Sequence, residues 1–330
     1  MKQYMEKYPR IDLHLHSSFS DGTCTPEEIA AEAREKKIDL IALTDHNTFA
    51  GIERFRKAVR KEGQKAAAGI ELTSGYRTAD QKTKEIHVLG YFSIQADMES
   101  EKFALLNQRI CEYGNSKYLQ LEKILENIAE DYPEISVQEF YEYIVNIKPD
   151  KNYNRVHIAN YLVHRGLAET VQECFERFLS EKQKYYVPRK QITVEEAVHA
   201  IKEAGGLCII AHPAEYHFTD EEMERFFRHC RELSVDGVEV FHPSDSEEEV
   251  ERILKTFQKM GTDGDNPVSQ PFLISTGSDF HGANKKNAMG KGFFHDMERS
   301  VFRGIYEESC RIMYRKLTEE NSERYSVRSM

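Results

Sequence analysis

The chain has 330 residues, of which 40% are hydrophobic and 31% charged, and its formal net charge at pH 7 is −11. The length allows one barrel-sized domain with a smaller insertion, and the composition is ordinary for a globular protein. The negative net charge excludes a broad basic surface that binds a long nucleic-acid backbone. It is compatible with a small anionic substrate held by metal ions and a few arginines.

Neither a signal peptide nor a membrane span is expected. Residues 1–10 lack an apolar run, and no uncharged stretch approaches the roughly 18 residues that a span needs. The six cysteines contain no Cys-x-x-Cys pair, so neither a disulfide framework nor a thiolate zinc site is indicated. We therefore expect a cytoplasmic protein without membrane partners.

Short apolar runs alternate with amphipathic stretches along most of the chain. The runs predict buried parallel strands at residues 11–15, 38–43, 66–70, 86–92, 207–211, 235–241 and 272–274. Helix start signals lie between several runs, where Thr25 and Thr193 precede acidic residues in the manner of N-caps. Strand and helix alternate about seven times, which favours an α/β barrel that is closed or nearly closed.

The alternation is interrupted once. From about residue 97 to 189, apolar residues recur at helical spacing instead, as at Tyr118, Leu121, Leu125 and Ile128. We expect residues 97–189 to form an inserted helical subdomain that caps the barrel mouth, between the barrel parts 1–96 and 190–295. Residues 296–330 are expected to form a charged C-terminal segment, of which residues 319–330 fray.

Nearly every predicted strand delivers a metal-ligand side chain close to its end. In the first strand, Asp12, His14 and His16 share one face because successive side chains alternate, although a His-x-His pair alone is only moderately specific for a metal. Barrel enzymes gather their catalytic groups at the C-terminal ends of the strands, so the further candidates are expected to meet this pair. They are Asp21, His46, Glu71, His212, Asp279 and His281, with His87 at the opening of its run.

Nine nitrogen and oxygen ligands exceed what one ion accepts, and they predict two or three divalent ions such as manganese, zinc or iron. Such ions lower the pKa of a bound water from 15.7 towards about 7 and clamp the oxygens of a phosphate. We therefore predict hydrolysis of a phosphate ester by a metal-activated hydroxide, with Asp21, His46, Glu71 and Asp279 as catalytic residues. Asp45 is expected either to orient a ligand or to cap the following helix.

Five segments resemble successive motifs of the PHP (polymerase and histidinol phosphatase) family. They are HLHSSFSDG at 14–22, TDHN at 44–47, GIE at 69–71, AHP at 211–213 and SDFH at 278–281. The resemblance implies a distorted (β/α)7 TIM-like barrel with a trinuclear metal centre. It assigns His14, His16, Glu71 and Asp279 to one ion, Asp21, His46 and His281 to a second, and His87 and His212 to a third, with Glu71 bridging.

The insertion is similar to that of bacterial phosphoesterases acting on nucleoside 3′,5′-bisphosphates and on the 5′ ends of short oligonucleotides. Its segments NRVHIA at 154–159 and YVPR at 186–189 carry the likeness. They imply that Arg155, His157 and either Arg189 or Lys190 hold the phosphate that is not cleaved, since guanidinium groups bind phosphates through paired donors. The chain departs from these relatives after the strand ending at Phe241, where His242 is a candidate substrate contact and leaves the exact substrate open.

The sequence therefore predicts a phosphomonoesterase for a nucleotide such as a nucleoside 3′,5′-bisphosphate or AMP. The expected partners are a small phosphorylated metabolite, a nucleotide or a short oligonucleotide. A histidinol-phosphate phosphatase and a 5′–3′ exonuclease on short RNA are the enzymatic alternatives. A metal-stabilised binding module without turnover is the alternative of another class, and the filling of all nine ligand positions disfavours it.

Overall fold

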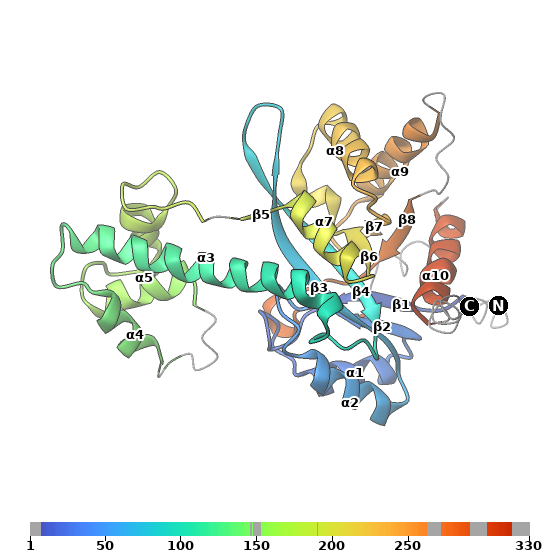
Figure 1. Cartoon of the computed structure of the whole chain (residues 1–330), viewed down its shortest axis with the longest axis horizontal. Helices are drawn as coiled ribbons and strands as arrows, with labels where there is room; N and C mark the ends of the chain where they lie inside the picture. The colour runs from blue at the N-terminus through green and yellow to red at the C-terminus, as the bar shows by residue number, and fades with distance from the viewer. Residues whose placement is uncertain are drawn as a thin grey trace. The chain divides into compact units, whose positions relative to one another are not determined.

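The computed structural model of the chain describes residues 8–145, 147, 153–189, 191–262, 272–290 and 302–318 (Figure 1). The residues cluster into two compact units. The barrel unit comprises Met1–Ile110 and Ile192–Met330, and the helical unit comprises Cys111–Gln191. One long helix, α3 (Ala104–Ala129), begins in the barrel unit and continues into the helical unit.

A single sheet forms the centre of the barrel unit. Its strands follow the order β1 (Ile11–Leu15), β2 (Leu40–Leu43), β3 (Lys65–Arg77), β4 (Thr83–Ser93), β6 (Leu207–Ile210), β7 (Gly237–Phe241) and β8 (Leu273–Thr276), while β5 (Ile192–Thr193) pairs with β3. The two ends of this path meet, since Leu15 and Phe280 form a parallel bridge and the backbone N–H of His16 donates to the carbonyl of Phe280 at 2.9 Å. The predicted α/β fold with a nearly closed, TIM-like barrel is confirmed.

The expectation that all strands run parallel was wrong for β4, which runs antiparallel to both β3 and β6. Only residues 78–82 connect β3 to β4, whereas a parallel crossover needs a dozen or more residues. The β3–β4 pair is therefore a long hairpin, in which Thr73 pairs with His87. As a result, His87 lies at the barrel end where the parallel strands finish, because the next residue, Val88, pairs with Ile210 at the end of β6.

Helices cover the outside of the sheet (Figure 1). They are α1 (Pro26–Glu35), α2 (Ile52–Glu62), α7 (Val194–Glu203), α8 (Asp220–Glu232), α9 (Glu247–Thr262) and α10 (Arg303–Thr318), with short 3-10 turns at η2 (Glu101–Phe103), η4 (Pro213–Tyr216) and η5 (Gly282–Asn284). The predicted N-caps are confirmed, because Thr25 and Thr193 each form a capping box with the glutamate three residues later.

The C-terminal segment contributes to the barrel core. Helix α10 buries Tyr306, Cys310, Met313 and Leu317, whose spacing of three and four residues is the helical signal that sequence analysis did not use. Residues 319–330, for which fraying was predicted, lie outside the described residues.

The helical unit has a core of its own. It contains the rest of α3, α4 (Val137–Val145), α5 (Arg155–His164), α6 (Val171–Cys174) and a π-helical turn, η3 (Phe175–Leu179). Leu121, Leu125 and Ile128 are buried in this core, as their helical spacing predicted. The suggestion that the insertion caps the barrel mouth stays a prediction.

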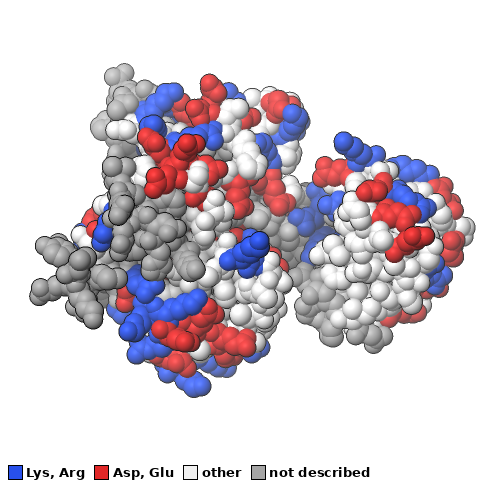
Figure 2. Space-filling view, turned by 180° about the vertical axis from the view of Figure 1, so that it is seen from behind, with Lys and Arg blue, Asp and Glu red and all other residues white. Residues whose placement is uncertain are grey.

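On the molecular face that Figure 2 presents, acidic and basic side chains lie side by side on both units. No continuous basic stripe is visible there among the described residues, in keeping with the net charge of −11. Within the same residues, no helix combines the length and the apolar character that crossing a membrane requires.

Candidate metal centre

The nine candidate ligands come from the barrel end at which the parallel strands finish. Strand β1 supplies His14 and is followed directly by His16, β3 supplies Glu71, and β4 supplies His87, its fifth residue. The other candidates follow strand ends: Asp21 after β1, His46 after β2, His212 after β6, and Asp279 and His281 after β8. The barrel topology thus brings all nine to one place.

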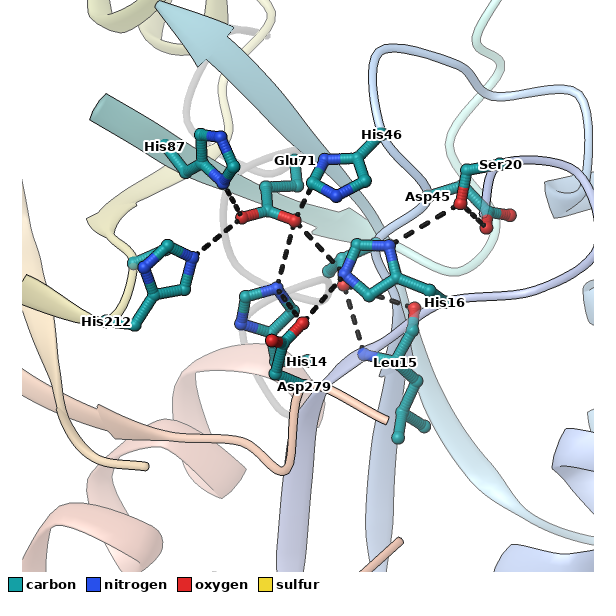
Figure 3. Close-up of polar contacts among 12 residues, drawn as sticks. His14, Leu15, His16, Ser20, Asp45, His46, Glu71, His87, His212 and Asp279 are labelled. Carbon is teal, nitrogen blue, oxygen red and sulfur yellow. Dashed lines mark hydrogen bonds and ion pairs between the residues drawn. The ribbon is translucent and has the colours of Figure 1, made fainter. Parts of the chain in front are cut away.

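Glu71 lies at the centre of this cluster and is fully buried (Figure 3). Its Oε2 lies 3.1 Å from each of three imidazole nitrogens, which are Nε2 of His14, Nε2 of His16 and Nδ1 of His46. Its Oε1 lies 2.7 Å from Nδ1 of His87 and 3.2 Å from Nε2 of His212. One carboxylate therefore contacts five of the six candidate histidines.

Two aspartates complete the cluster. Oδ1 of Asp279 lies 3.5 Å from Nε2 of His14 and 3.3 Å from Nε2 of His16. Oδ1 of Asp21 lies 3.1 Å from Nε2 of His281, and its Oδ2 lies 3.6 Å from Nε2 of His46. Asp279 is buried, whereas half of the Asp21 side chain is exposed, so the cluster opens to solvent on the Asp21 side.

Three groups of side chains bring their ligand atoms within 4.8 Å of one another. They are His14, His16, Glu71 and Asp279; His16, Asp21, His46 and His281; and His46, Glu71 and His87. The first group coincides with the set that the family resemblance implied for one ion. The second adds His16 to the implied set. The third joins His46 to His87, while His212 is outside it although it contacts Glu71.

The donor set fits divalent cations. Nε2 of His14, Nε2 of His16, Nδ1 of His46 and Oε2 of Glu71 are buried and have no hydrogen-bond partner, although each nitrogen lies 3.1 Å from that oxygen. Buried polar atoms nearly always have partners, so a cluster of such atoms needs an explanation. Imidazole nitrogens and carboxylate oxygens that converge without hydrogen bonding are suited to share cations of the zinc, manganese or iron type.

The imidazoles of the cluster differ in how strongly they bind protons. Burial opposes a charge on His16, but its contacts with Asp279 and Glu71 raise its pKa to about 9. Burial also lowers the pKa of His87, but the charge of Glu71 outweighs this effect and raises the pKa to about 10. At His46 burial prevails and lowers the pKa to about 3. A cation must therefore displace protons from some of these imidazoles.

Two candidates have a left-handed backbone, which is uncommon outside glycine. His212 has a φ of 24° and Asp279 a φ of 49°. Each follows its strand directly or within a few residues, and the turn aims its side chain back at the cluster. Backbone strain of this kind concentrates at functional sites, where surrounding contacts hold it in place.

Asp45 supports the loop after β1. Its carboxylate accepts hydrogen bonds from the backbone N–H and the hydroxyl of Ser17, both at 2.7 Å, and from the hydroxyl of Ser20 at 2.7 Å. Oγ of Ser20 lies 3.5 Å from Nδ1 of His16. Helix α2 starts after Gly51 without a side-chain cap. Of the two roles predicted for Asp45, orientation of the ligand loop therefore fits and helix capping does not.

Two charged residues at the cluster, Glu239 and Lys285, were not among the predicted site residues. Glu239 is fully buried in β7 and contacts Nδ1 of His14 with both oxygens, at 3.1 and 3.2 Å. The signal available was a glutamate within the otherwise apolar run 237–241. Lys285, in the loop after β8, forms an ion pair with Oδ2 of Asp279 and is partly exposed.

The four candidate substrate contacts lie in different units. His242 follows β7, and its Nε2 lies 3.6 Å from Oδ2 of Asp279, so the barrel brings it to the cluster. The other three belong to the helical unit. There Arg155 donates to the carbonyl of Leu179 at 3.0 Å, Nδ1 of His157 accepts from the backbone of Asn154 at 2.9 Å, and Arg189 stacks over the ring of Tyr113. Lys190, the alternative to Arg189, lies outside the described residues.

Comparison with known proteins agrees with this geometry. A 5′–3′ exoribonuclease from Haemophilus influenzae is 25% identical over 272 residues, which cover 82% of this chain and 90% of that protein. A 3′,5′-nucleoside bisphosphate phosphatase from Chromobacterium violaceum is 26% identical over 282 residues, covering 82% of this chain and 87% of the relative.

A solved structure from Bifidobacterium adolescentis, described provisionally as a metal-dependent phosphoesterase, is similar with a TM-score of 0.60 and 26% identity. The similarity covers 86% of this chain and 91% of that one. The PHP domain matches residues 12–262, which is most of the sequence. The chain therefore belongs to the PHP domain family.

Proposed function

We propose that the chain is a phosphomonoesterase that acts on a nucleotide, such as a nucleoside 3′,5′-bisphosphate or AMP, with two or three divalent ions of manganese, zinc or iron. Its family and its relatives make it a metal-dependent phosphoesterase. The observation that carries the proposal is the convergence of five histidines on the two oxygens of Glu71, with buried donor atoms left unpartnered.

Ions bound to this cluster would lower the pKa of a water molecule to about 7 and neutralise the charge of a phosphate. Glu71 would bridge ions, because each of its oxygens faces a different subset of histidines. Asp279 would join His14 and His16 at one position, and Asp21 would join His46 and His281 at another. His87 and His212 would hold a third ion together with Oε1 of Glu71.

The exposure of the ligands defines the side from which the phosphate approaches. The side chains of His14, His16 and Glu71 are at most 1% exposed, whereas Asp21 is 52% and His46 is 24% exposed. A phosphate would therefore enter over Asp21 and His46. The ammonium group of Lys285 forms an ion pair with Oδ2 of Asp279. An ammonium group has three hydrogen-bond donors, so this contact leaves donors for the oxygens of a phosphate. Lys285 is suited to meet the negative charge of the phosphate.

A single substitution tests the metal-dependent step. In Asp279→Ala, we expect metal content to fall and phosphate release to drop to the background of the uncatalysed reaction. Circular dichroism and gel filtration would establish that the variant is folded. A folded Asp279→Ala protein with wild-type turnover would contradict the proposal.

The second candidate is a 5′–3′ exonuclease on short RNA, which the similarity to the Haemophilus influenzae exoribonuclease favours. A short RNA labelled at its 3′ end distinguishes the two activities. Removal of a 5′ phosphate alone leaves the length unchanged, whereas exonuclease action gives a ladder of shorter labelled products. The same metal-loaded preparation should be assayed with adenosine 3′,5′-bisphosphate, so that both rates refer to one metal content.

A further inference from the structure

Glu239 has surroundings that are unusual for a carboxylate. It lies in the middle of β7 (Gly237–Phe241), between Val238 and Val240, and none of its surface is exposed. Burying a carboxylate is costly unless it is hydrogen-bonded or paired. Among the described residues, its hydrogen-bond partners are not lysine or arginine side chains but parts of two candidate ligands, His14 and His212.

The contact with His14 fixes which nitrogen of that ring carries the proton. A carboxylate can only accept, so Nδ1 of His14, at 3.1 and 3.2 Å from the two oxygens of Glu239, is the protonated nitrogen. The opposite nitrogen, Nε2, then presents its lone pair to the cluster, where it lies 3.1 Å from Glu71 and 3.5 Å from Asp279. Glu239 thus selects the tautomer that can bind an ion through Nε2.

The contact with His212 fixes a strained piece of backbone. Oε2 of Glu239 accepts a hydrogen bond from the backbone N–H of His212 at 3.0 Å. His212 is one of the two candidates with a left-handed backbone, at a φ of 24°. Strain of this kind persists only where neighbouring contacts hold it. The same carboxylate therefore orients a ligand from β1 and a ligand that follows β6.

The packing beside Glu239 leaves no room for a larger neighbour. A Cβ atom added to Gly277 would lie 2.2 Å from Cβ of His14 and 2.7 Å from Oε1 of Glu239. The absence of a side chain at position 277 is thus what allows His14 and Glu239 to approach one another. The arrangement depends on contributions from β1, β6, β7 and the end of β8 together.

We propose that Glu239 is a positioning residue that holds His14 and His212 in their metal-binding orientations, so that it sets the affinity of two separate ion positions. This inference rests on the proposed function, because it presupposes that the cluster binds ions. It adds a fully buried residue that lies outside the nine candidate ligands.

The test is metal affinity measured by competition with a chelator, for the wild type, Glu239→Gln and Glu239→Ala. We expect Glu239→Gln to weaken binding about 10-fold and Glu239→Ala up to about 100-fold, the range found for supporting contacts of metal ligands. Glutamine keeps an oxygen for both donors but loses the charge, so its effect should be the smaller. Glu239→Gln preserves shape and answers the question even if Glu239→Ala does not fold.

The matched control is Asp236→Asn. Asp236 also accepts a hydrogen bond from a strand N–H, that of Cys208, and pairs with Lys202, but it precedes β7 at the opposite end of the barrel. Its substitution should leave metal affinity unchanged. Destabilisation of the barrel by loss of a carboxylate would instead affect both positions alike.

A spectroscopic readout separates positioning from a merely structural role. In the zinc-loaded wild type, the 15N shifts of His14 should report a protonated Nδ1 and a metal-bound Nε2, and Glu239→Ala should lose this pattern. Wild-type metal affinity and an unchanged His14 pattern in Glu239→Gln and Glu239→Ala would overturn the inference. A wild type that binds no metal would instead refute the proposed function itself.

Discussion

His46 and Glu71 lie opposite one another in an isolated parallel bridge, and Nδ1 of His46 is 3.1 Å from Oε2 of Glu71. The same oxygen lies equally close to His14 and His16. The backbone pairing of the segment after β2 with the middle of β3 therefore brings His46 to the oxygen that His14 and His16 also approach.

Replacing Glu71 by glutamine should remove most of the metal and nearly all of the activity. The amide has no charge and offers one acceptor where the carboxylate offers two, so the ions lose their shared ligand. We expect a loss of turnover greater than the roughly 10- to 100-fold that follows removal of a supporting contact. Elemental analysis and phosphate release measure it, with the exposed Glu53→Gln on α2 as the control. Retention of full metal content by Glu71→Gln would contradict the assignment.

Replacing Asp45 by alanine should loosen the loop that carries Asp21. The substitution leaves the buried backbone N–H and hydroxyl of Ser17 without the acceptor they share, which costs about 1–3 kcal/mol for each unsatisfied group, and it removes one of the contacts of Ser20. We expect a lower midpoint of urea unfolding and a reduced kcat. Ser20→Ala should have a smaller effect on both, since the two contacts to Ser17 remain. Equal effects of the two substitutions would argue against the role of Asp45.

The affinity for metal should rise with pH. His16 and His87 have pKa values of about 9 and about 10 in the metal-free protein, so at neutral pH a cation must displace their protons. Chelator-competition titrations at pH 6, 7 and 8 should give progressively tighter binding. Proton release should accompany binding, and calorimetry in buffers of different ionisation enthalpy measures it. Affinity that is independent of pH would contradict this expectation.

The stability of the metal-free protein should fall as the pH rises, whereas the affinity for metal should increase. The two pKa values lie above the ordinary value for histidine of about 6.5. Ion pairs that raise the pKa of a histidine in the folded protein stabilise the fold fully at pH values below the pKa that the histidine has in the unfolded chain. This contribution to stability is lost as the pH rises through the folded-state pKa. The melting temperature of chelator-treated protein should therefore fall as the pH rises from about 7 towards 10. A constant or rising melting temperature would show that these pairs do not stabilise the fold.

Arg155 is predicted to hold the phosphate that is not cleaved. If so, Arg155→Ala should raise KM for adenosine 3′,5′-bisphosphate and leave KM for p-nitrophenyl phosphate, which has one phosphate, unchanged. Because Arg155 also donates to the carbonyl of Leu179, Arg155→Lys should be compared for folding. Arg165→Ala on the same unit serves as the control, since Arg165 pairs with Glu139. Equal changes of KM for both substrates would contradict the role of Arg155.

Much of the fold and the set of candidate ligands could be predicted from the sequence, because both follow local rules. Alternation along β1 and the residue after it puts His14 and His16 on one face, and polar residues directly after apolar runs mark strand ends. The antiparallel direction of β4 was missed, because the predicted strands 66–70 and 86–92 left fifteen residues between them, enough for a crossover. The structure extends both strands, so that only residues 78–82 connect them.

The contacts of Glu239 could not be derived in the same way. They depend on the lateral order of the strands, which places β7 within reach of His14 on β1 and of His212 after β6. A buried glutamate in an apolar strand signals that a partner exists but does not identify it. The same holds for Lys285, whose pairing with Asp279 depends on how the loop after β8 turns.

The most direct test of the central claim is phosphate release from adenosine 3′,5′-bisphosphate by one preparation that is assayed after chelation and again after reconstitution with manganese, zinc or iron. We expect no turnover after chelation and restored turnover with at least one of the metals, faster than with p-nitrophenyl phosphate or histidinol phosphate under the same conditions. Full activity in the chelated, metal-free protein, or a folded, metal-loaded protein that releases no phosphate from any of the three compounds, would contradict it.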